Sequence, residues 1–243
     1  MTIKYLLLIL FTMVCSTIVF GADLGDEFYN SENVNASYTL ALSGAYVSNG
    51  IKSTGNCFQP SIDFTHEYGW GGLNYGVWST FDISKSEVSD ETDPYFSLSY
   101  NLSTMFSWSL GYTLWNYSKD TDRNENIFIT SVFANVFLSP SFELQYNETS
   151  DNYDMVFSIN HEYSIIKGIY LEGKCSLGYI NKVSRSDFFY YLFSLGIRKN
   201  VCSFYDVFIG ANITGNRASN SIDSSYQGGR DFSFFTISVT TSF

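Results

Sequence analysis

Polar and apolar residues alternate with a period of two along almost the whole chain from Ala36 to Phe243. This period places successive side chains on opposite faces of a β-strand, and no segment after the N-terminal leader shows the 3.6-residue period of a helix. Turn-forming residues divide the pattern into twelve segments. The predicted strands are 36–48, 57–68, 72–84, 95–104, 105–118, 127–138, 141–149, 154–165, 168–181, 187–199, 202–215 and 231–243. The sequence therefore predicts an all-β fold.

The first residues have the form of a secretory signal peptide. A lysine precedes an apolar run that ends at Phe20, and the first acidic residue is Asp23. The run is short for a transmembrane helix, which needs about 20 apolar residues. We expect residues 1–21 to be cleaved, a short periplasmic tail at 22–35, and a single domain at 36–243. An uncleaved N-terminal anchor is the alternative.

The connections between the predicted strands alternate in length. Long polar segments such as 85–94 and 216–230 alternate with tight ones such as "SP" at 139–140. Long outer loops and short periplasmic turns are typical of bacterial outer-membrane β-barrels. Most of the strands reach the ~9–11 residues that cross a bilayer at a tilt. The prediction is an antiparallel up-and-down transmembrane β-barrel of twelve strands, with both termini on the periplasmic side.

Each predicted strand has one apolar and one polar face. In 168–181, Leu171 and Leu177 share one face, whereas Glu172 and Lys174 share the other. Hydrocarbon tolerates only the apolar face, and closure of the sheet pairs every backbone N–H and C=O group. A secreted soluble β-sandwich or barrel also alternates, and it is the alternative fold.

The last predicted strand, "DFSFFTISVTTSF", keeps its apolar alternation to the end of the chain. Its apolar face resembles the assembly signal of outer-membrane β-barrels. The residues of that face are Phe235, Ile237, Val239 and Phe243. We therefore expect the outer-membrane assembly machinery to bind this strand after the chain is secreted to the periplasm, and we expect outer-membrane lipid to surround the barrel.

The stretch "YVSNGIKSTGNCFQPSIDFTHEYGWGGLNYGVWSTFDIS" at 46–84 has a distinctive order of elements. A strand ends in aromatic-Val-Ser-x-Gly, and a polar loop, Gln-Pro-Ser, a Gly-rich turn and Tyr-Gly-Val-Trp-Ser follow. This order resembles the first two hairpins of the TorF-type putative porins, a family of small bacterial outer-membrane barrels. The matching residues are Val47, Ser48, Gly50, Gln59, Pro60, Gly72, Gly76, Val77, Trp78 and Ser79. Asn49 departs from the pattern, which has arginine there. The resemblance implies a barrel with a pore and supplies no catalytic residue.

Alternation also predicts which charged side chains point into the barrel. The predicted lumen residues are Asp63, Glu67, Asp82, Glu143, Glu162, Glu172, Lys174, Arg198 and Asp206. An acidic wall favours cations or neutral polar solutes over anions. The predicted function is a porin-like channel for passive diffusion of small polar or cationic solutes, in which the long loop 216–230 has the length to fold inward as a constriction. The alternative is a filled, non-conducting barrel whose outer loops bind ligands or host surfaces.

The chain has only two histidines, His66 in "THEY" and His161 in "NHEY". Alternation places both on the outward face near the periplasmic end, on opposite walls of the barrel. A shared metal site is not feasible there, because metal ligands lie about 2 Å from one ion. Neither histidine fits the pattern of an outer-membrane lipase or an omptin-like protease. We expect no enzyme activity, catalytic residue, metal or cofactor.

Charge and cysteine content limit the partners further. The net charge of −11 becomes −12 when the signal peptide removes Lys4. Nucleic acid is excluded, because phosphate binding needs clustered Lys and Arg. The odd number of mature cysteines cannot all pair, so Cys57, Cys175 and Cys202 are expected to be unpaired. The acidic loops 85–94 and 119–126 are expected to be solvated, with Ca²⁺ or a cationic partner as the alternative.

Overall fold

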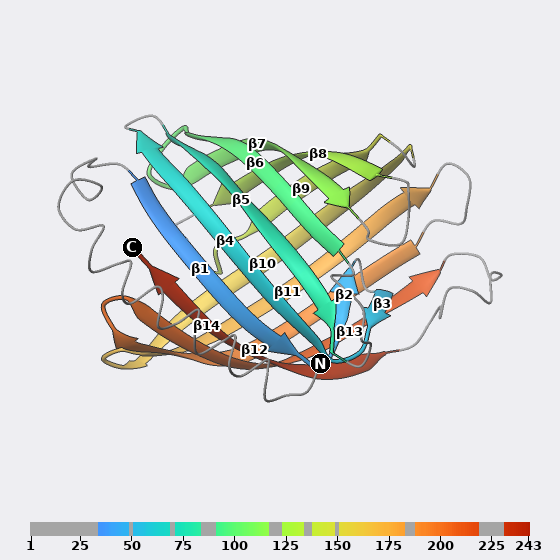
Figure 1. Cartoon of the computed structure of the whole chain (residues 1–243). Helices are drawn as coiled ribbons and strands as arrows, with labels where there is room; N and C mark the ends of the chain where they lie inside the picture. Colours follow the sequence, from blue (N-terminus) through green and yellow to red (C-terminus); the bar gives the residue numbers. More distant parts are fainter. Residues whose placement is uncertain are drawn as a thin grey trace.

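Twelve strands of the chain close into one antiparallel barrel, and two short strands form a separate hairpin (Figure 1). The computed structural model describes residues 34–48, 51–68, 71–83, 91–116, 123–133, 138–148, 151–182, 188–218 and 231–243. The barrel strands are β1 (Val34–Ser43), β4 (Cys57–Tyr68), β5 (Gly71–Asp82), β6 (Glu91–Asn101), β7 (Phe106–Asn116), β8 (Arg123–Phe133), β9 (Ser141–Asn147), β10 (Asn152–Ile166), β11 (Ile169–Lys182), β12 (Phe188–Cys202), β13 (Tyr205–Ala218) and β14 (Phe232–Ser242). The hairpin strands are β2 (Tyr46–Ser48) and β3 (Ile51–Thr54). Within these ranges there is no helix long and apolar enough to cross a membrane. The predicted signal peptide lies outside them.

Each barrel strand pairs with its neighbours in sequence, and the first and last strands close the ring. Leu40 of β1 pairs with Val239 of β14 on one side and with Pro60 of β4 on the other. At the end of this seam, Ala36 and Phe243 exchange both backbone hydrogen bonds, with N···O distances of 3.1 and 2.8 Å. Closure gives every described barrel strand a hydrogen-bonded neighbour on both sides. The predicted twelve-stranded antiparallel barrel is confirmed.

The two ends of the barrel differ in their connections. The end that holds Val34 and Phe243, here called the terminal end, has tight turns at 167–168 and 203–204, and only two residues separate β4 from β5 there (left in Figure 1). The opposite end, here called the loop end, joins strands through longer segments in most cases. The membrane side that each end faces stays a prediction.

The first predicted strand, 36–48, is wrong in its second half, because β1 ends at Ser43 and a new hairpin begins at Tyr46. The Ser43 hydroxyl donates to the Ala45 carbonyl oxygen at 2.8 Å, and the Gly44 N–H donates to the Phe235 carbonyl oxygen at 2.8 Å. A local side-chain-to-backbone bond of this kind competes with the strand ladder. The chain therefore leaves the wall at Ser43 although the polar–apolar alternation continues.

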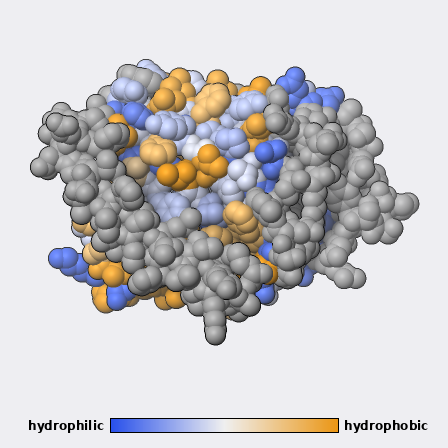
Figure 2. All heavy atoms as spheres, viewed as in Figure 1, coloured by the Kyte–Doolittle hydropathy of each residue, from blue (hydrophilic) through white to orange (hydrophobic). Residues whose placement is uncertain are grey.

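The outward face of the wall is apolar and exposed. Leu195 at the middle of β12 is 58% exposed and Phe235 on β14 is 71% exposed. Neighbouring outward rings also pack together, as Tyr179 and Phe189 do with a centroid distance of 4.9 Å. Figure 2 shows such apolar patches on the face of the wall in view. A soluble barrel would bury a surface of this size, whereas hydrocarbon accommodates it.

Candidate functional site

The interior of the barrel contains a cavity of about 470 Å³. Its lining comes from strands all around the ring, including Gln59 of β4, Trp78 of β5, Glu143 of β9, Lys174 of β11 and Asn212 of β13. Hydroxyl and amide groups make up much of the remaining lining. The cavity is therefore a polar lumen enclosed by the sheet, and not a groove on its outer surface.

Large inward aromatic rings lie along this wall because inward glycines make room for them. A Cβ on Gly178 would stand 2.0 Å from Cζ of Tyr190, and one on Gly111 would stand 2.2 Å from Cζ of Phe128. The ring of Phe208 covers two further glycines in the same way. Glycine weakens a strand, and an aromatic ring across from it offsets that loss. The arrangement keeps these rings against the sheet and away from the axis of the lumen.

The strand register places every predicted lumen residue on the inward face. The residues are Asp63, Glu67, Asp82, Glu143, Glu162, Glu172, Lys174, Arg198 and Asp206. Four of them meet at one place near the terminal end, and Glu143 and Lys174 line the cavity. Asp63, Glu67 and Asp82 lie on the wall formed by β4 and β5. Their contribution to conduction stays a prediction.

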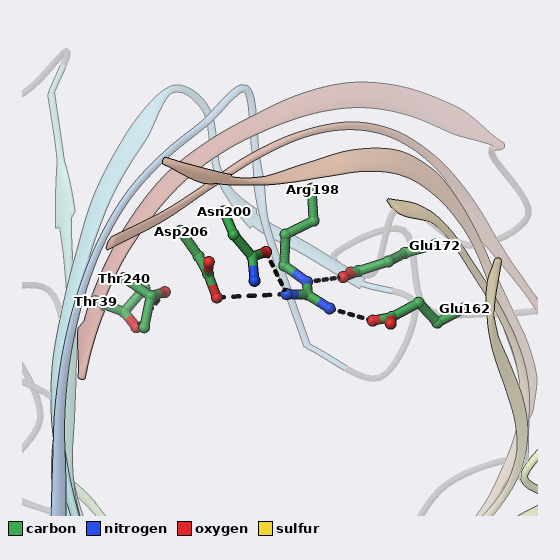
Figure 3. Close-up of polar contacts among 7 residues, drawn as sticks. All are labelled: Thr39, Glu162, Glu172, Arg198, Asn200, Asp206 and Thr240. Carbon is green, nitrogen blue, oxygen red and sulfur yellow. Dashed lines mark hydrogen bonds and ion pairs between the residues drawn. The ribbon is translucent and has the colours of Figure 1, made fainter. Parts of the chain in front are cut away.

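The four residues that meet form a cluster centred on Arg198 of β12 (Figure 3). Its guanidinium group binds the carboxylates of Glu162 on β10 and Glu172 on β11, and it lies 3.4 Å from Asp206 on β13. The guanidinium carbon lies 4.5 Å from the centroid of the Tyr170 ring. One cation therefore faces three carboxylates, and the cluster keeps a net negative charge.

The polar surface continues from this cluster across the closing seam. Asp206 pairs with Thr240 on β14, and the Thr240 hydroxyl lies 3.0 Å from the hydroxyl of Thr39 on β1. Figure 3 shows the side chains of both threonines on the same side of the sheet as those of Arg198 and Asp206. A polar arc thus covers the strands from β10 around to β1 near the terminal end.

Lys174 and Glu143 differ in how they are held. The Glu143 carboxylate accepts hydrogen bonds from the Thr130 hydroxyl at 3.0 Å and the Gln145 amide at 2.5 Å, so its orientation is fixed. Lys174 is exposed to the cavity and has no ion pair with any residue in the described part of the chain. Among the described residues, no carboxylate forms an ion pair with Lys174, so its positive charge faces the lumen.

Three inward acids were missed by the sequence reasoning. Glu91 and Asp93 were assigned to the loop 85–94, whereas they belong to β6, where Glu91 is 2% exposed. Pro94 is tolerated in β6, because β6 pairs with β7 only from Tyr95 onward and the missing N–H breaks no bond on that side. Asp154 is the first residue of a predicted strand, and the single Tyr190 hydroxyl donates to its carboxylate, with Oδ1 and Oδ2 at 3.1 and 3.0 Å. Glu91, Thr92 and Asp93 are all polar, so polar–apolar alternation gives no signal for this part of β6.

The histidines lie on the outside of the barrel. His66 Nε2 lies 3.1 Å from the Tyr75 hydroxyl, and the two rings stack with a centroid distance of 5.7 Å. His161 pairs with Gly173 on the outward face of β10, opposite β4 in the ring. No group of three or more His, Cys, Asp or Glu among the described residues is arranged to hold a metal ion. The three described cysteines form no disulfide.

The rim of the barrel at the loop end carries a separate ion pair. Arg217 Nη1 lies 2.8 Å from Asp231 Oδ1, and Nη2 lies 3.1 Å from Oδ2. Hydrogen bonding from Arg217, and then from Tyr191, holds the pKa of Asp231 below its usual value. Arg217 pairs with Phe189 on the outward face of the wall, so this ion pair is separate from the lumen cluster.

Known proteins resemble this chain in fold but not in sequence. No protein-family model matches the chain, and no curated protein sequence matches it. The KdgM porin has 12% identity and a TM-score of 0.52, covering 86% of this chain and 99% of that chain. The NanC porin has 10% identity and a TM-score of 0.52, covering 83% and 98%. The COG4313 outer membrane channel from Pseudomonas putida F1 has 9% identity and a TM-score of 0.51, covering 87% and 95%. The chain thus has the fold of small outer-membrane porins and channels.

Proposed function

We propose that this chain is an outer-membrane channel through which small polar or cationic solutes diffuse passively. The observation that carries the proposal is the charge of the inward face around a polar cavity. The inward acids with described side chains are Asp63, Glu67, Asp82, Glu91, Asp93, Glu143, Asp154, Glu162, Glu172 and Asp206. In the same part of the chain only Lys174 and Arg198 are inward cations.

This charge balance sets the expected solute class. Low-dielectric walls focus the potential of the charges that line a narrow passage, so an acidic lumen concentrates cations and repels anions. The KdgM porin has been seen in complex with disordered oligogalacturonate, a polyanion. An acid-lined lumen opposes entry of such a solute. We therefore propose small cationic or neutral polar solutes for this chain, and not acidic oligosaccharides.

The rival function is a non-conducting barrel whose extracellular loops bind ligands or host surfaces. Such a barrel needs a filled interior, and the rings of Tyr190 and Phe128, which lie over glycines along the wall, favour an open one. The proposal involves diffusion only and needs no catalytic residue.

Three finer proposals accompany the channel. The resemblance at 46–84 supports membership of the TorF-type porins. The apolar face of the last strand, which includes Phe243, is bound by the outer-membrane assembly machinery. The chain reaches the outer membrane through the periplasm after its signal peptide is cleaved.

Conductance of the refolded mature chain in planar bilayers tests the channel. We expect steady ohmic conductance, and a reversal potential of cation-selective sign in a KCl gradient. Asp63→Asn removes an inward charge that accepts a hydrogen bond from Ser61 at 3.1 Å, and it should move the reversal potential toward zero. Glu148→Gln removes the same charge from an exposed turn and is the matched control, with a smaller shift.

Two results would overturn the proposed function. Anion selectivity of the wild type would contradict the acid-lined lumen. A folded barrel without conductance, in which Asp63→Asn changes only the stability, would support the filled, structural barrel instead.

A further inference from the structure

The β2–β3 hairpin begins inside the lumen and not outside the barrel. Ala45, Tyr46 and Val47 line the same cavity as Glu143 of β9 and Asn212 of β13, which belong to other parts of the ring. Figure 1 shows both hairpin strands near the loop end. The segment after β1 therefore contributes to the inner surface of the barrel.

Local contacts fix where the hairpin enters. Ala45 is almost fully buried, and its carbonyl oxygen accepts the hydrogen bond from Ser43. The ring of Tyr46 packs on the ring of Trp78, with a centroid distance of 5.1 Å and an interplanar angle of 44°. Trp78 belongs to the inward face of β5, where it pairs with Ser61 and Asp93. An aromatic pair thus joins the hairpin to the lumen wall.

The hairpin is structurally separate from the barrel wall. Tyr46 pairs with Thr54 and Val47 with Lys52, and in the described part of the chain neither β2 nor β3 belongs to the barrel sheet. The ring is closed by β1 with β14 and by β1 with β4, without the hairpin. Shortening the hairpin therefore leaves every barrel ladder intact.

We propose that the hairpin strands β2 and β3, held by the Tyr46–Trp78 contact, form the constriction that sets the size limit for solutes. This inference rests on the proposed channel function and names the element that selects within it. A polypeptide segment inside the lumen reduces its cross-section, and pore radius and the groups that line it determine what passes. A solute that passes this point meets the two aromatic rings on one side and polar side chains, such as Asn212, on the other.

The sequence pointed to a different segment for this role. The loop 216–230 was singled out by its length, and residues 219–230 of it lie outside the described residues. The hairpin was hidden because its residues continue the alternation of β1. The placement of Ala45 and Tyr46 in the cavity lining identifies it.

The test compares the wild type with two variants of the full mature chain. In the first, residues 48–53 are replaced by Gly-Gly, which removes most of the hairpin and keeps Tyr46. In the second, Tyr46→Ala removes only the contact with Trp78. The control is Tyr75→Ala, which removes an aromatic residue from the outer face of β5, where it stacks on Phe64 at 5.2 Å. Heat-modifiable migration on gels verifies that each barrel is folded.

Single-channel conductance and liposome swelling with neutral sugars of increasing size are measured for all four proteins. We expect the hairpin variant to conduct about twofold more than the wild type and to admit larger sugars. Tyr46→Ala should change both in the same direction by less, and Tyr75→Ala should change neither.

The outcomes separate the constriction from the channel. A conducting wild type whose size limit is unchanged by the hairpin variant and by Tyr46→Ala would overturn the constriction and leave the channel. A silent wild type with a conducting hairpin variant would overturn passive diffusion and support the hairpin as the obstruction. If all the folded proteins are silent, both proposals are wrong.

Discussion

Replacement of Arg198 by methionine tests whether the lumen cluster stabilises the barrel. Arg198 is 24% exposed and binds Glu162, Glu172 and Asp206, which are 33–45% exposed. Its Nη1 also donates to Asn200 Oδ1 at 3.0 Å. Methionine keeps much of the aliphatic length of the side chain, so the substitution removes the charge and its hydrogen bonds with little loss of packing volume.

The size of the effect follows from the exposure of the partners. An exposed ion pair contributes about 0.2–1 kcal/mol, and loss of one partner from a fully buried pair costs about 3–5 kcal/mol. The contact with the Tyr170 ring contributes about 0.5–1 kcal/mol more. Three partly exposed pairs and this ring contact give an expected loss of about 2–3 kcal/mol in the free energy of unfolding. Without Arg198, repulsion among the carboxylates of Glu162, Glu172 and Asp206 also lowers the free energy of unfolding.

Lys174→Met is the matched control, because it removes the same charge from the same wall. Lys174 has no ion pair with a described residue, so the expected change is within about 0.5 kcal/mol. Urea unfolding in lipid vesicles, followed by tryptophan fluorescence, measures both variants. Salt at 1 M shortens the screening length to about 3 Å and should narrow the difference between them.

Equal losses of stability for Arg198→Met and Lys174→Met would refute this reasoning, because the two differ mainly in their ion pairs. A loss for Arg198→Met that does not respond to salt would assign it to packing and not to charge. Either result would show that the ion pairs of Arg198 do not stabilise the barrel.

Three further substitutions, the first with a matched control, test the packing, the outer face and the assembly signal. Gly178→Ala should destabilise the barrel by about 1–3 kcal/mol and lower conductance, because the new Cβ displaces the Tyr190 ring toward the lumen. A Cβ on Gly173 would have nothing within 4 Å, so Gly173→Ala should change neither stability nor conductance. If Gly173→Ala and Gly178→Ala had equal effects, contact with the Tyr190 ring would not explain the loss in Gly178→Ala. Leu195→Arg, at the middle of β12, should cost about 2–4 kcal/mol of folding free energy in a bilayer, and no cost there would contradict the membrane-facing wall. Phe243→Ala should lower the amount of barrel assembled in the outer membrane of cells, without preventing refolding in vesicles; wild-type assembly would argue against the C-terminal signal.

The fold was predictable because alternation is a direct consequence of strand geometry. The inward position of Glu172 and the outward position of Leu177 follow from the parity of their numbers along β11. The closing contact of β1 with β14 follows from the even number of strands and the need to leave no edge in lipid. No contact energy had to be known for these inferences.

The contacts within the site were not predictable from alternation. Parity places Arg198, Glu162 and Asp206 on the inward face, but it does not show that they meet, because the stagger between neighbouring strands decides that. The same limit applies at Ser43, where a hydrogen bond to Ala45 ends the strand although the pattern continues. Glu91 lies in β6 although it falls in an acidic and polar stretch, which is typical of a loop.

Whether a barrel of twelve strands is open depends on where its inward rings lie. Strand number places this chain between the filled small barrels and the open large ones. The face of the Tyr190 ring packs over Gly178, and the Tyr190 hydroxyl donates to Asp154. These two contacts fix the orientation of the side chain. Tyr46 is different, because it comes from the hairpin and packs on Trp78. The wall therefore holds the Tyr190 ring against the sheet, whereas Trp78 lines the cavity together with Tyr46 of the hairpin. The narrowing that we propose depends on the hairpin, which is not part of the barrel sheet.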